Sequence, residues 1–275
     1  MELKELLKKK KKRDAMKTHS TLDLAKRAAA FAAGEQHVKS GCRIGVGSGT
    51  TAKFLVEFLA EKVNDGTVKD IICVPSSFST RQWLIDYGLQ VIDLEKILDL
   101  DLCIDGADEV DINLNCIKGG GGGCLTQEKI VQTCAKKFYI IADASKQSEK
   151  LGDRNFPIPI EVVPFGYAPV LNWIKRQEGG EVKLRTNSKE NLGPFITDNN
   201  NFILDWNFPK NKYETTEDLS ALHTRLISLP GVVETGLFIG VAEKAYFATA
   251  DGNVTERLRP DPSLHFSRNQ KPSRH

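Results

Sequence analysis

The chain has 275 residues, of which 40% are hydrophobic and 27% are charged. This length suits one large domain or two modest ones, and the composition excludes a disordered chain or a coiled coil as the main architecture. No apolar run approaches the roughly 20 residues that a transmembrane helix needs, and no apolar stretch follows the basic N-terminus as in a signal peptide. We therefore expect a cytoplasmic protein with no membrane partner.

The net charge of +2 conceals a basic N-terminus. Of the 38 basic and 36 acidic residues, eight and three lie in residues 1–17, which leaves 30 and 33 in the rest of the chain. A mildly acidic body gives no argument for a nucleic-acid partner. The lysine run could be a nuclear-localisation or polyanion-binding arm, but we expect a solvated, disordered tail. Translation could also begin at Met16, which would omit the run.

The six cysteines form no CxxC pair and have no zinc-type spacing with the five histidines. Several, including Cys73 and Cys103, lie within apolar runs, which is typical of buried, reduced thiols. No HExxH motif occurs, so we expect no metal site.

Helices and strands alternate through the first half of the chain. The apolar pattern predicts helices over residues 21–38, 79–87 and 125–135, a further helix after Thr51, and strands over residues 42–47, 70–74, 90–92, 100–104 and 138–142. Alternation at this spacing indicates a parallel sheet with helices on both faces, an α/β fold.

The pattern changes after Pro157, Pro159 and Pro164. Residues 168–177, 181–185, 201–206 and 217–229 are predicted to form helix, strand, strand and helix, which is typical of a small α+β insert. Late strands are predicted over residues 232–239 and 244–250, and both could return to the main sheet.

A glycine-rich turn, GVGSGTT over residues 45–51, joins a predicted strand to a predicted helix. The free N–H groups of a helix start, together with the hydroxyls of Ser48, Thr50 and Thr51, would suit a phosphate. The turn lacks the third glycine of a dinucleotide motif and the Gly-Lys-Ser/Thr ending of a Walker loop. A simple tight turn is the alternative.

Two carboxylates, Asp105 and Asp108, follow an apolar run in the segment DGADEVD. The carboxyl ends of strands line the ligand crevice of an open α/β sheet, so these groups could bind sugar hydroxyls or transfer protons. The alternative is an acidic turn in which Asp105 caps the next segment of the chain. Lys146, just past another predicted strand, could complete an anion site or be a solvated surface lysine.

Five consecutive glycines separate Lys118 from the predicted helix that contains Glu128. Ordering such a run costs much chain entropy, which favours a use in which backbone approaches a ligand. Glu128 shares a helical stripe with Cys124, Val131 and Ala135, so its carboxylate should face inward, where it must be paired or functional. A helix-start glutamate that interacts with the helix dipole is the alternative.

Taken together, the motifs GVGSGTT, DGADEVD, KGGGGGCLTQEK and ADASK resemble ribose-5-phosphate isomerase of the A type, over roughly residues 20–258. The segments FITDN and LPGVV are similar to that family as well. The resemblance implies a Rossmann-like parallel-sheet domain with an inserted, smaller α+β (ferredoxin-like) lid domain. We expect the first over residues 19–158 and 232–258 and the lid over residues 159–231, between tails at 1–18 and 259–275.

The resemblance also implies an aldose–ketose isomerase of the pentose phosphate pathway. It would interconvert D-ribose 5-phosphate and D-ribulose 5-phosphate through an enediolate, with no metal or organic cofactor, as a homodimer or homotetramer. Carried over by motif, Glu128 is the general base, and Lys118 and Asp105 stabilise or protonate the developing oxygen charges. The residues implied to bind the sugar phosphate are Lys26, Ser48, Gly49, Thr50, Thr51, Asp105, Gly106, Ala107, Asp108, Lys118, Gly119, Gly120, Gly121 and Lys146.

One departure lies in the glycine run. The family's glutamate usually follows the lysine by nine positions, whereas Glu128 follows Lys118 by ten. The extra glycine either bulges harmlessly or displaces the two side chains relative to each other.

Three other classes of protein fit parts of the sequence. A sugar-phosphate-binding regulator or a coenzyme-A transferase on a similar fold would not need Asp105, Lys118 and Glu128 together. A nucleotide-dependent oxidoreductase is disfavoured by the missing third glycine, and a nucleic-acid-binding protein rests only on the N-terminal lysines.

Overall fold

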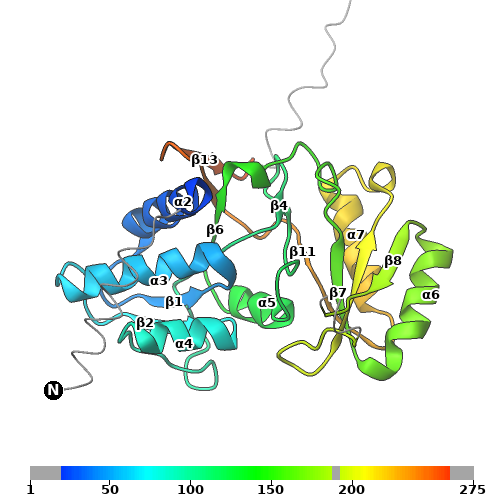
Figure 1. Ribbon diagram of the computed structural model, residues 1–275, viewed down its shortest axis with the longest axis horizontal. Coiled ribbons are helices and arrows are strands. Elements are labelled where there is room, and N and C mark those ends of the chain that lie inside the picture. Colours follow the sequence, from blue (N-terminus) through cyan, green and yellow to red (C-terminus); the bar gives the residue numbers. More distant parts are fainter. Residues whose placement is uncertain (1–19, 188–192, 261–275) are drawn as a thin grey trace, which may run out of the picture.

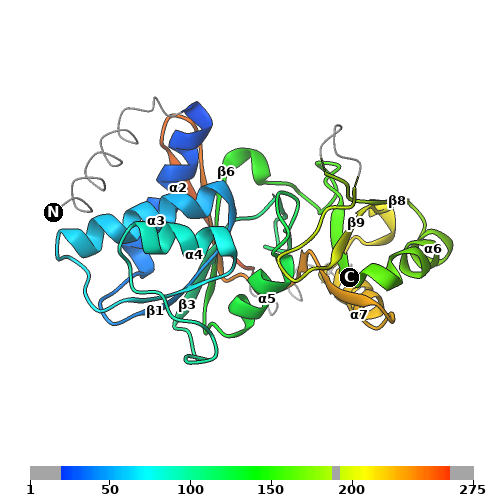
Figure 2. The same cartoon turned by 60° about the horizontal axis from the view of Figure 1, so that its bottom comes forward.

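The structure, a computed structural model, describes residues 20–187 and 193–260, so the predicted N-terminal tail, Met16 and nearly all of the predicted C-terminal tail lie outside the described residues. Two units lie side by side, a larger one built on a mostly parallel sheet and a smaller one built on an antiparallel sheet (Figure 1). The second view shows the same separation, with helix α5 and a few short strands between the units (Figure 2).

The larger unit contains a six-stranded sheet in the order β13-β12-β6-β3-β1-β2. Its parallel strands are β1 (Arg43–Val46), β2 (Ile72–Pro75), β3 (Leu102–Asp105), β6 (Phe138–Asp143) and β12 (Lys244–Ala248). Strand β13 (Val254–Leu258) closes one edge as an antiparallel hairpin with β12. This parallel arrangement confirms the predicted fold class.

Both faces of this sheet are covered. Helices α2 (Thr21–His37), α3 (Gly49–Asn64) and α4 (Phe78–Asp86) contribute to the core on one face, and α5 (Leu125–Thr133) contributes to the core on the other. Within β6, Tyr139 and Ile141 face the first core, whereas Phe138 and Ile140 face the second. Strands buried on both faces are continuously apolar, which explains why they were visible in the sequence.

The smaller unit has the order of elements β7-α6-β8-β9-α7-β10. Its antiparallel sheet has the order β10-β7-β9-β8, which is the ferredoxin-like split βαβ arrangement. Its bounds are β7 (Ile158–Val162), α6 (Tyr167–Gln177), β8 (Glu181–Leu184), β9 (Phe202–Asn207), α7 (Thr216–Ile227) and β10 (Val232–Thr235). A separate core around the fully buried Trp206 holds it together.

A third, three-stranded sheet with the order β11-β5-β4 lies next to helix α5 in the ribbon. It consists of β4 (Glu109–Val110), β5 (Cys116–Ile117) and β11 (Leu237–Phe238). The short helices η1 (Ala144–Lys146), η2 (Pro164–Gly166) and η3 (Lys210–Lys212) complete the described elements. The sequence did not indicate this sheet, because its strands are only two residues long.

Two predicted strands differ from the structure. Residues 90–92 form no strand, and Val91 makes a single bridge to Cys73. The predicted strand over residues 232–239 breaks at Gly236, where a Cβ would lie 2.2 Å from the carbonyl oxygen of Lys118. The chain therefore changes sheets there, and neither half joins the main sheet.

The sheets also place the units' limits differently from the expected boundaries. Strand β10 belongs to the four-stranded sheet rather than to the larger unit, and β7, which starts at Ile158, was missed. Prolines seldom lie inside a sheet, so Pro157 and Pro159 concealed that strand in the sequence.

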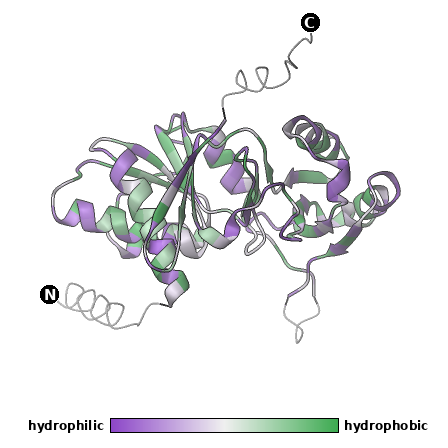
Figure 3. Cartoon of the chain, turned by 90° about the horizontal axis from the view of Figure 1, so that it is seen from above, coloured by the Kyte–Doolittle hydropathy of each residue, from purple (hydrophilic) through white to green (hydrophobic). Residues whose placement is uncertain are grey.

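Hydropathy follows this architecture. Hydrophobic residues run through the strands of the larger unit (Figure 3), and most buried residues of the described chain are apolar, with charged exceptions that include Asp105, Lys118 and Glu128. Among the helices that the structure describes, none combines the length and the apolar character needed to span a membrane.

Candidate functional site

A cavity of about 430 Å³ lies at one edge of the main sheet. Strands β1, β3 and β6 are neighbours in this sheet, and the chain segments after their carboxyl ends line the cavity. Residues that line it and were predicted from the sequence are Lys26, Ser48, Gly49, Thr50, Thr51, Gly106, Ala107, Asp108, Lys118, Gly119, Gly121, Glu128 and Lys146. The remaining two predicted residues, Asp105 and Gly120, lie directly behind this lining.

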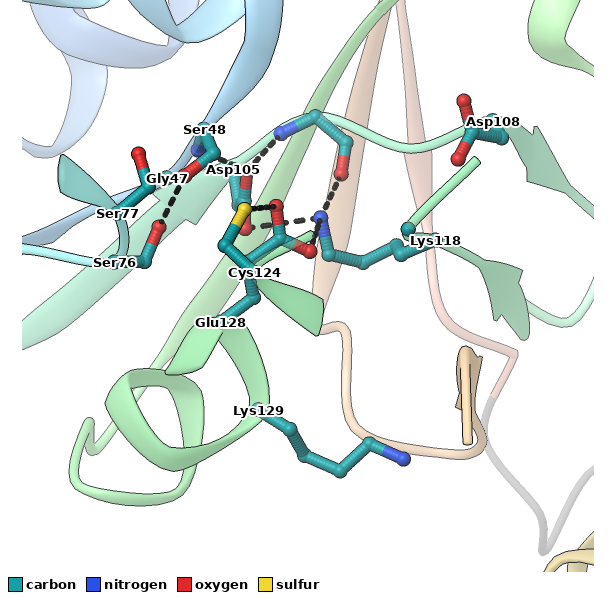
Figure 4. A network of polar contacts seen from close by, with 12 residues as sticks. Gly47, Ser48, Ser76, Ser77, Asp105, Asp108, Lys118, Cys124, Glu128 and Lys129 are labelled. Atoms are coloured by element: carbon teal, nitrogen blue, oxygen red, sulfur yellow. Dashed lines mark hydrogen bonds and ion pairs between the residues drawn. The ribbon is translucent and has the colours of Figure 1, made fainter. Parts of the chain in front are cut away.

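Three charged side chains form a buried cluster at the cavity (Figure 4), in which Lys118 and Glu128 line the cavity and Asp105 lies behind them. The ammonium of Lys118 lies 2.9 Å from Asp105 Oδ2 and 3.2 Å from Glu128 Oε2, and it donates to the carbonyl oxygen of Gly106 at 2.5 Å. The three side chains are almost inaccessible to solvent, with exposed fractions of 3%, 1% and 6% for Lys118, Asp105 and Glu128. One cation thus serves two carboxylates.

Asp105 is the fixed member of this cluster. It is the last residue of β3, and its Oδ1 accepts from the backbone N–H groups of Ser48 at 3.0 Å and Gly106 at 2.7 Å. A Cβ at Gly47 would lie 1.9 Å from Asp105 Oδ1, so only glycine fits there. The glycine-rich turn after β1 therefore has a structural role in seating Asp105.

Glu128 is the second carboxylate of the cluster. It lies in the first turn of α5, where its Oε1 accepts from the thiol of Cys124 at 3.6 Å and its Oε2 has, among the described residues, only Lys118 beside it. Burial and the charge of Asp105 raise its pKa from the usual 4.5 to about 7, although Lys118 opposes the shift. A carboxylate with a pKa near neutrality suits a base that must both accept and return a proton.

Lys118 keeps its proton. Burial alone would lower the pKa of Lys118, but the charges of Asp105 and Glu128 outweigh that effect and raise the pKa above its usual value. The ammonium is therefore a permanent positive charge at the cavity wall.

The glycine loop, residues 119–123, leads from Lys118 to helix α5. Gly119 has a φ of +91°, and Gly120 donates its N–H to Asp108 Oδ2 at 2.8 Å. No atom lies within 4 Å of a Cβ built on Gly121, so the extra residue of the loop occupies open space. The 3.2 Å contact between Lys118 and Glu128 shows that a spacing of ten residues still brings the two side chains together.

The start of helix α3 also borders the cavity. Ser48 is its N-cap residue, and no side chain caps the first turn. Thr50 and Thr51 lie in that turn, and Lys26 from α2 and Lys146 from η1 also line the cavity. Backbone N–H groups, hydroxyls and two cations thus surround one end of the cavity, which suits an anionic group.

Several cavity residues were not predicted from the sequence: Ser77, Ser79, Trp83, Asp143, Ser145 and Asp198. Ser77 caps helix α4 and, like the predicted residues, comes after a strand that ends at this edge. The serine-rich segment after β2 could have indicated it. Asp198, which accepts from the N–H of Phe78 at 3.3 Å, comes from the smaller unit. In the sequence, only its place in the segment FITDN could have indicated it.

A second buried lysine, Lys129, points away from the cluster (Figure 4). Its ammonium lies 2.8 Å from Glu234 Oε1 and donates to the carbonyls of Thr235 and Leu237, both at 2.7 Å. Burial lowers its pKa to about 8. Lys129 therefore attaches α5 to the segment where the chain passes from β10 to β11.

One family model matches well over half of the chain. Residues 72–252 match the family model for ribose 5-phosphate isomerase A (phosphoriboisomerase A). The chain belongs to the ribose 5-phosphate isomerase A family.

Relatives of this isomerase family match most of the chain. A Caenorhabditis elegans protein named probable ribose 5-phosphate isomerase is 56% identical over 86% of this chain and 92% of its own length. The human ribose-5-phosphate isomerase is 46% identical over 90% of this chain and 77% of its own length.

Solved structures of the family agree with the fold. The ribose 5-phosphate isomerase of Plasmodium falciparum matches with a TM-score of 0.79 at 34% identity, covering 87% of this chain and 100% of that one. A D-ribose-5-phosphate isomerase in complex with phospho-erythronic acid matches with a TM-score of 0.78 at 32% identity, covering 85% of this chain and 98% of that one.

The raised pKa of Glu128 predicts a pH-dependent effect on stability. Because the folded-state pKa of about 7 exceeds the usual 4.5, ionising Glu128 in the folded state opposes folding. The contribution of Glu128 to the free energy of unfolding therefore falls as pH rises from about 4.5 to about 7, and it stays at its lowest value above that range. Glu128→Gln lacks this cost, so its free energy of unfolding relative to wild type should be higher at pH 8 than at pH 5, by roughly 1–3 kcal/mol. Urea denaturation at the two pH values measures this, and an equal difference at both would contradict the shift.

Proposed function

We propose that Glu128 is the base of this isomerase. In its ionised form it takes the proton from C2 of a sugar phosphate, and it then delivers that proton to C1. The observation that carries the proposal is the buried cluster in which Glu128 lies 3.2 Å from Lys118, whose ammonium lies 2.9 Å from Asp105. A carboxylate is rarely buried without a structural or chemical role, and this one borders a cavity.

Membership of the family makes the chain an aldose–ketose isomerase. It interconverts D-ribose 5-phosphate and D-ribulose 5-phosphate, a reaction of the pentose phosphate pathway. The substrate is therefore a sugar phosphate, and the reaction moves one hydrogen from C2 to C1 with no net oxidation.

The first step removes the proton from C2. In the open-chain aldose this proton is weakly acidic, because the adjacent carbonyl accepts the electron pair that the C–H bond releases. The Glu128 carboxylate takes the proton, and the product is an enediolate with one negative charge, on O1, while O2 still carries its hydroxyl proton. The ammonium of Lys118, fixed by Asp105, stabilises that charge.

The second step returns the proton. The hydroxyl proton passes from O2 to O1, Glu128, now a carboxylic acid, delivers its proton to C1, the electron pair left on O2 closes the carbonyl at C2, and the ketose results. A base with a pKa of about 7 is half ionised near neutral pH, so it can perform both halves of the reaction.

The phosphate is the anchor in this proposal. We place it at the start of α3, against Ser48, Gly49, Thr50 and Thr51, with Lys26 and Lys146 as counter-charges. The phosphate takes no part in the chemistry, so its binding energy can hold the carbon chain in register with Glu128. Asp108 and the backbone of residues 106–107 and 119–121 are then left to contact the sugar hydroxyls.

The setting of the enzyme is part of the same proposal. A cytoplasmic location fits six cysteines that are all free thiols, and the mildly acidic body gives no reason to expect a nucleic-acid partner. We also propose a homodimer or homotetramer. Phe165 in η2 is fully exposed, and Val163, which follows β7, and Val233 on the neighbouring β10 are exposed as well, so a second copy of the chain would have apolar side chains to cover here. Light scattering on the purified protein measures the assembly.

Replacing the base should abolish turnover without abolishing binding. Glu128→Gln keeps the shape of the side chain but cannot accept the proton, so kcat should fall by at least ~10²-fold. Competition by inorganic phosphate should change little, because the proposed phosphate subsite does not include Glu128. Thr50→Val is the matched control, since it should weaken phosphate competition and retain more kcat. Wild-type turnover in Glu128→Gln would remove Glu128 as the base.

Proton transfer through an enediolate also predicts exchange with solvent. When the isomerisation runs in deuterium oxide, some deuterium should appear on the carbon that receives the hydrogen, and activity should survive a chelator. Internal return of the original proton lowers the incorporation but does not abolish it while the intermediate outlives exchange. Complete retention of the original hydrogen, together with loss of activity on chelation, would contradict proton transfer by Glu128. Mass spectrometry of the product measures the label.

A further inference from the structure

The glycine loop has the least restricted backbone in the sequence, yet it borders the cavity beside Glu128. Its two ends are held by close contacts. A Cβ on Gly120 would lie 2.2 Å from the ring of Phe156, and one on Gly123 would lie 2.8 Å from Thr197 Cα. The middle of the loop has no such contact, since a Cβ on Gly121 would meet nothing within 4 Å.

Hydrogen bonds to the side chains of Asp108 and Arg185 hold the loop between Gly119 and Gly122. Gly120 donates to Asp108, and Gly123 accepts from Asp198 N–H at 3.0 Å. Within the described residues, no backbone group pairs with the backbone of residues 119–122. The carbonyl oxygens of Gly119 and Gly122 both accept from the Nη1 of Arg185, at 2.8 and 3.1 Å.

Arg185 is itself held firmly. It follows β8 in the smaller unit, and its guanidinium forms a bidentate pair with Asp205 on β9, with Nε at 2.8 Å from Oδ2 and Nη2 at 2.5 Å from Oδ1. Its backbone N–H donates to Ile203 at 2.7 Å, and its carbonyl accepts from Phe195 at 2.9 Å. Its side chain is 12% exposed. Because two nitrogen atoms of the planar guanidinium bond to Asp205, the orientation of the group is fixed, and its third nitrogen, Nη1, points at the glycine loop.

We propose that Arg185, oriented by Asp205, is a positioning residue for the isomerase reaction: it fixes the glycine loop against Glu128 and Lys118. The inference rests on the proposed role of Glu128. Gly121 and Gly122 line the same cavity as Lys118 and Glu128, so the path of their backbone sets the space in which the reacting carbons lie. An unrestrained run of five glycines samples many conformations, and few of them leave that space intact.

The pair of hydrogen bonds from Arg185 to Gly119 and Gly122, here called the clamp, also explains why the loop tolerates the extra residue. A spacing of ten from Lys118 to Glu128 adds one freely rotating glycine to the loop. Because Arg185 bonds to Gly119 and Gly122 at once, it closes the loop across the added residue and leaves the 3.2 Å contact between Lys118 and Glu128 undisturbed.

The test compares two arginines of the smaller unit. Arg185→Ala removes the clamp, and Arg225→Ala is the matched control, because Arg225 also pairs with a carboxylate, Glu178, but does not touch the loop. For Arg185→Ala we expect kcat to fall by about tenfold to a hundredfold, the scale of a small misplacement of reacting groups. The inhibition constant of inorganic phosphate should stay within about twofold, because the proposed phosphate subsite does not include the glycine loop. Arg225→Ala should keep kcat within about twofold of wild type.

Chemical rescue separates positioning from a general loss of structure. Guanidinium chloride at millimolar concentration should restore part of the kcat of Arg185→Ala, because the ion can occupy the vacated place between Asp205 and the two carbonyls. It should not raise the kcat of Arg225→Ala or of wild type. If Arg185→Ala does not fold, Arg185→Lys replaces it, since one ammonium cannot serve Asp205 and both carbonyls, and its kcat should fall by at least about threefold.

The proposal is overturned if the folded Arg185 variant retains wild-type kcat, or if its loss equals that of Arg225→Ala and guanidinium restores nothing. Failure of the proposed function would look different. In that case Glu128→Gln would retain turnover, whatever the Arg185 variants did.

Discussion

The ammonium of Lys118, buried between two carboxylates, is the interaction on which the rest of this structure depends. A cation without solvent is stable only if its partners are held in place, and removing one partner of such a group is far more disruptive than disrupting a surface pair. The partners come from two separate segments: Asp105 ends β3 and is followed by Gly106, which supplies a carbonyl, and Glu128 lies in the first turn of α5. The fold can therefore be described as the means by which these segments meet.

Close backbone approach is the second constraint, and it results from the first. Gly47 must lack a side chain for Asp105 to reach its position, and Gly236 must lack one for β11 to lie beside Lys118. The backbone N–H of Lys118 donates to Gly236, and Lys129 donates to the carbonyls on either side of Gly236. The segment around Gly236 thus holds both Lys118, which follows β5, and the helix that contains Glu128. The two units of the chain meet at the buried cluster rather than beside it.

Much of this could be predicted from the sequence, for physical reasons. Strands β1, β3 and β6 are buried on both faces and are continuous apolar runs. Polar and charged side chains that come just after parallel strands must converge at one edge of the sheet. The inward phase of Glu128 in its helix was enough to predict its burial, which is confirmed. Which side chains then touch could not be predicted. The pairing of Lys118 with both carboxylates depends on distances that no periodicity encodes, and the proton held by Glu128 depends on burial and on Asp105 together.

The failures have equally specific causes. The three-stranded sheet consists of strands too short to show a period, β7 contains a proline, and the break at Gly236 is set by contact with a residue more than a hundred positions away. Arg185 follows a strand with no motif, and only its contacts with Asp205 and the glycine loop distinguish it from a surface arginine. Long-range contacts of this kind are the part of a site that sequence reasoning misses.

The most direct test of the buried cluster is the pH dependence of kcat/KM in wild type and in Asp105→Asn. Activity should rise with pH through an apparent pKa near 7, because the base must be ionised. The substrate phosphate also titrates, at about 6, but equally for both enzymes. Since the charge of Asp105 raises the pKa of Glu128, the Asp105→Asn variant should show lower activity with its acid limb displaced to lower pH. An acid limb that stays in place, or moves to higher pH, would contradict the account.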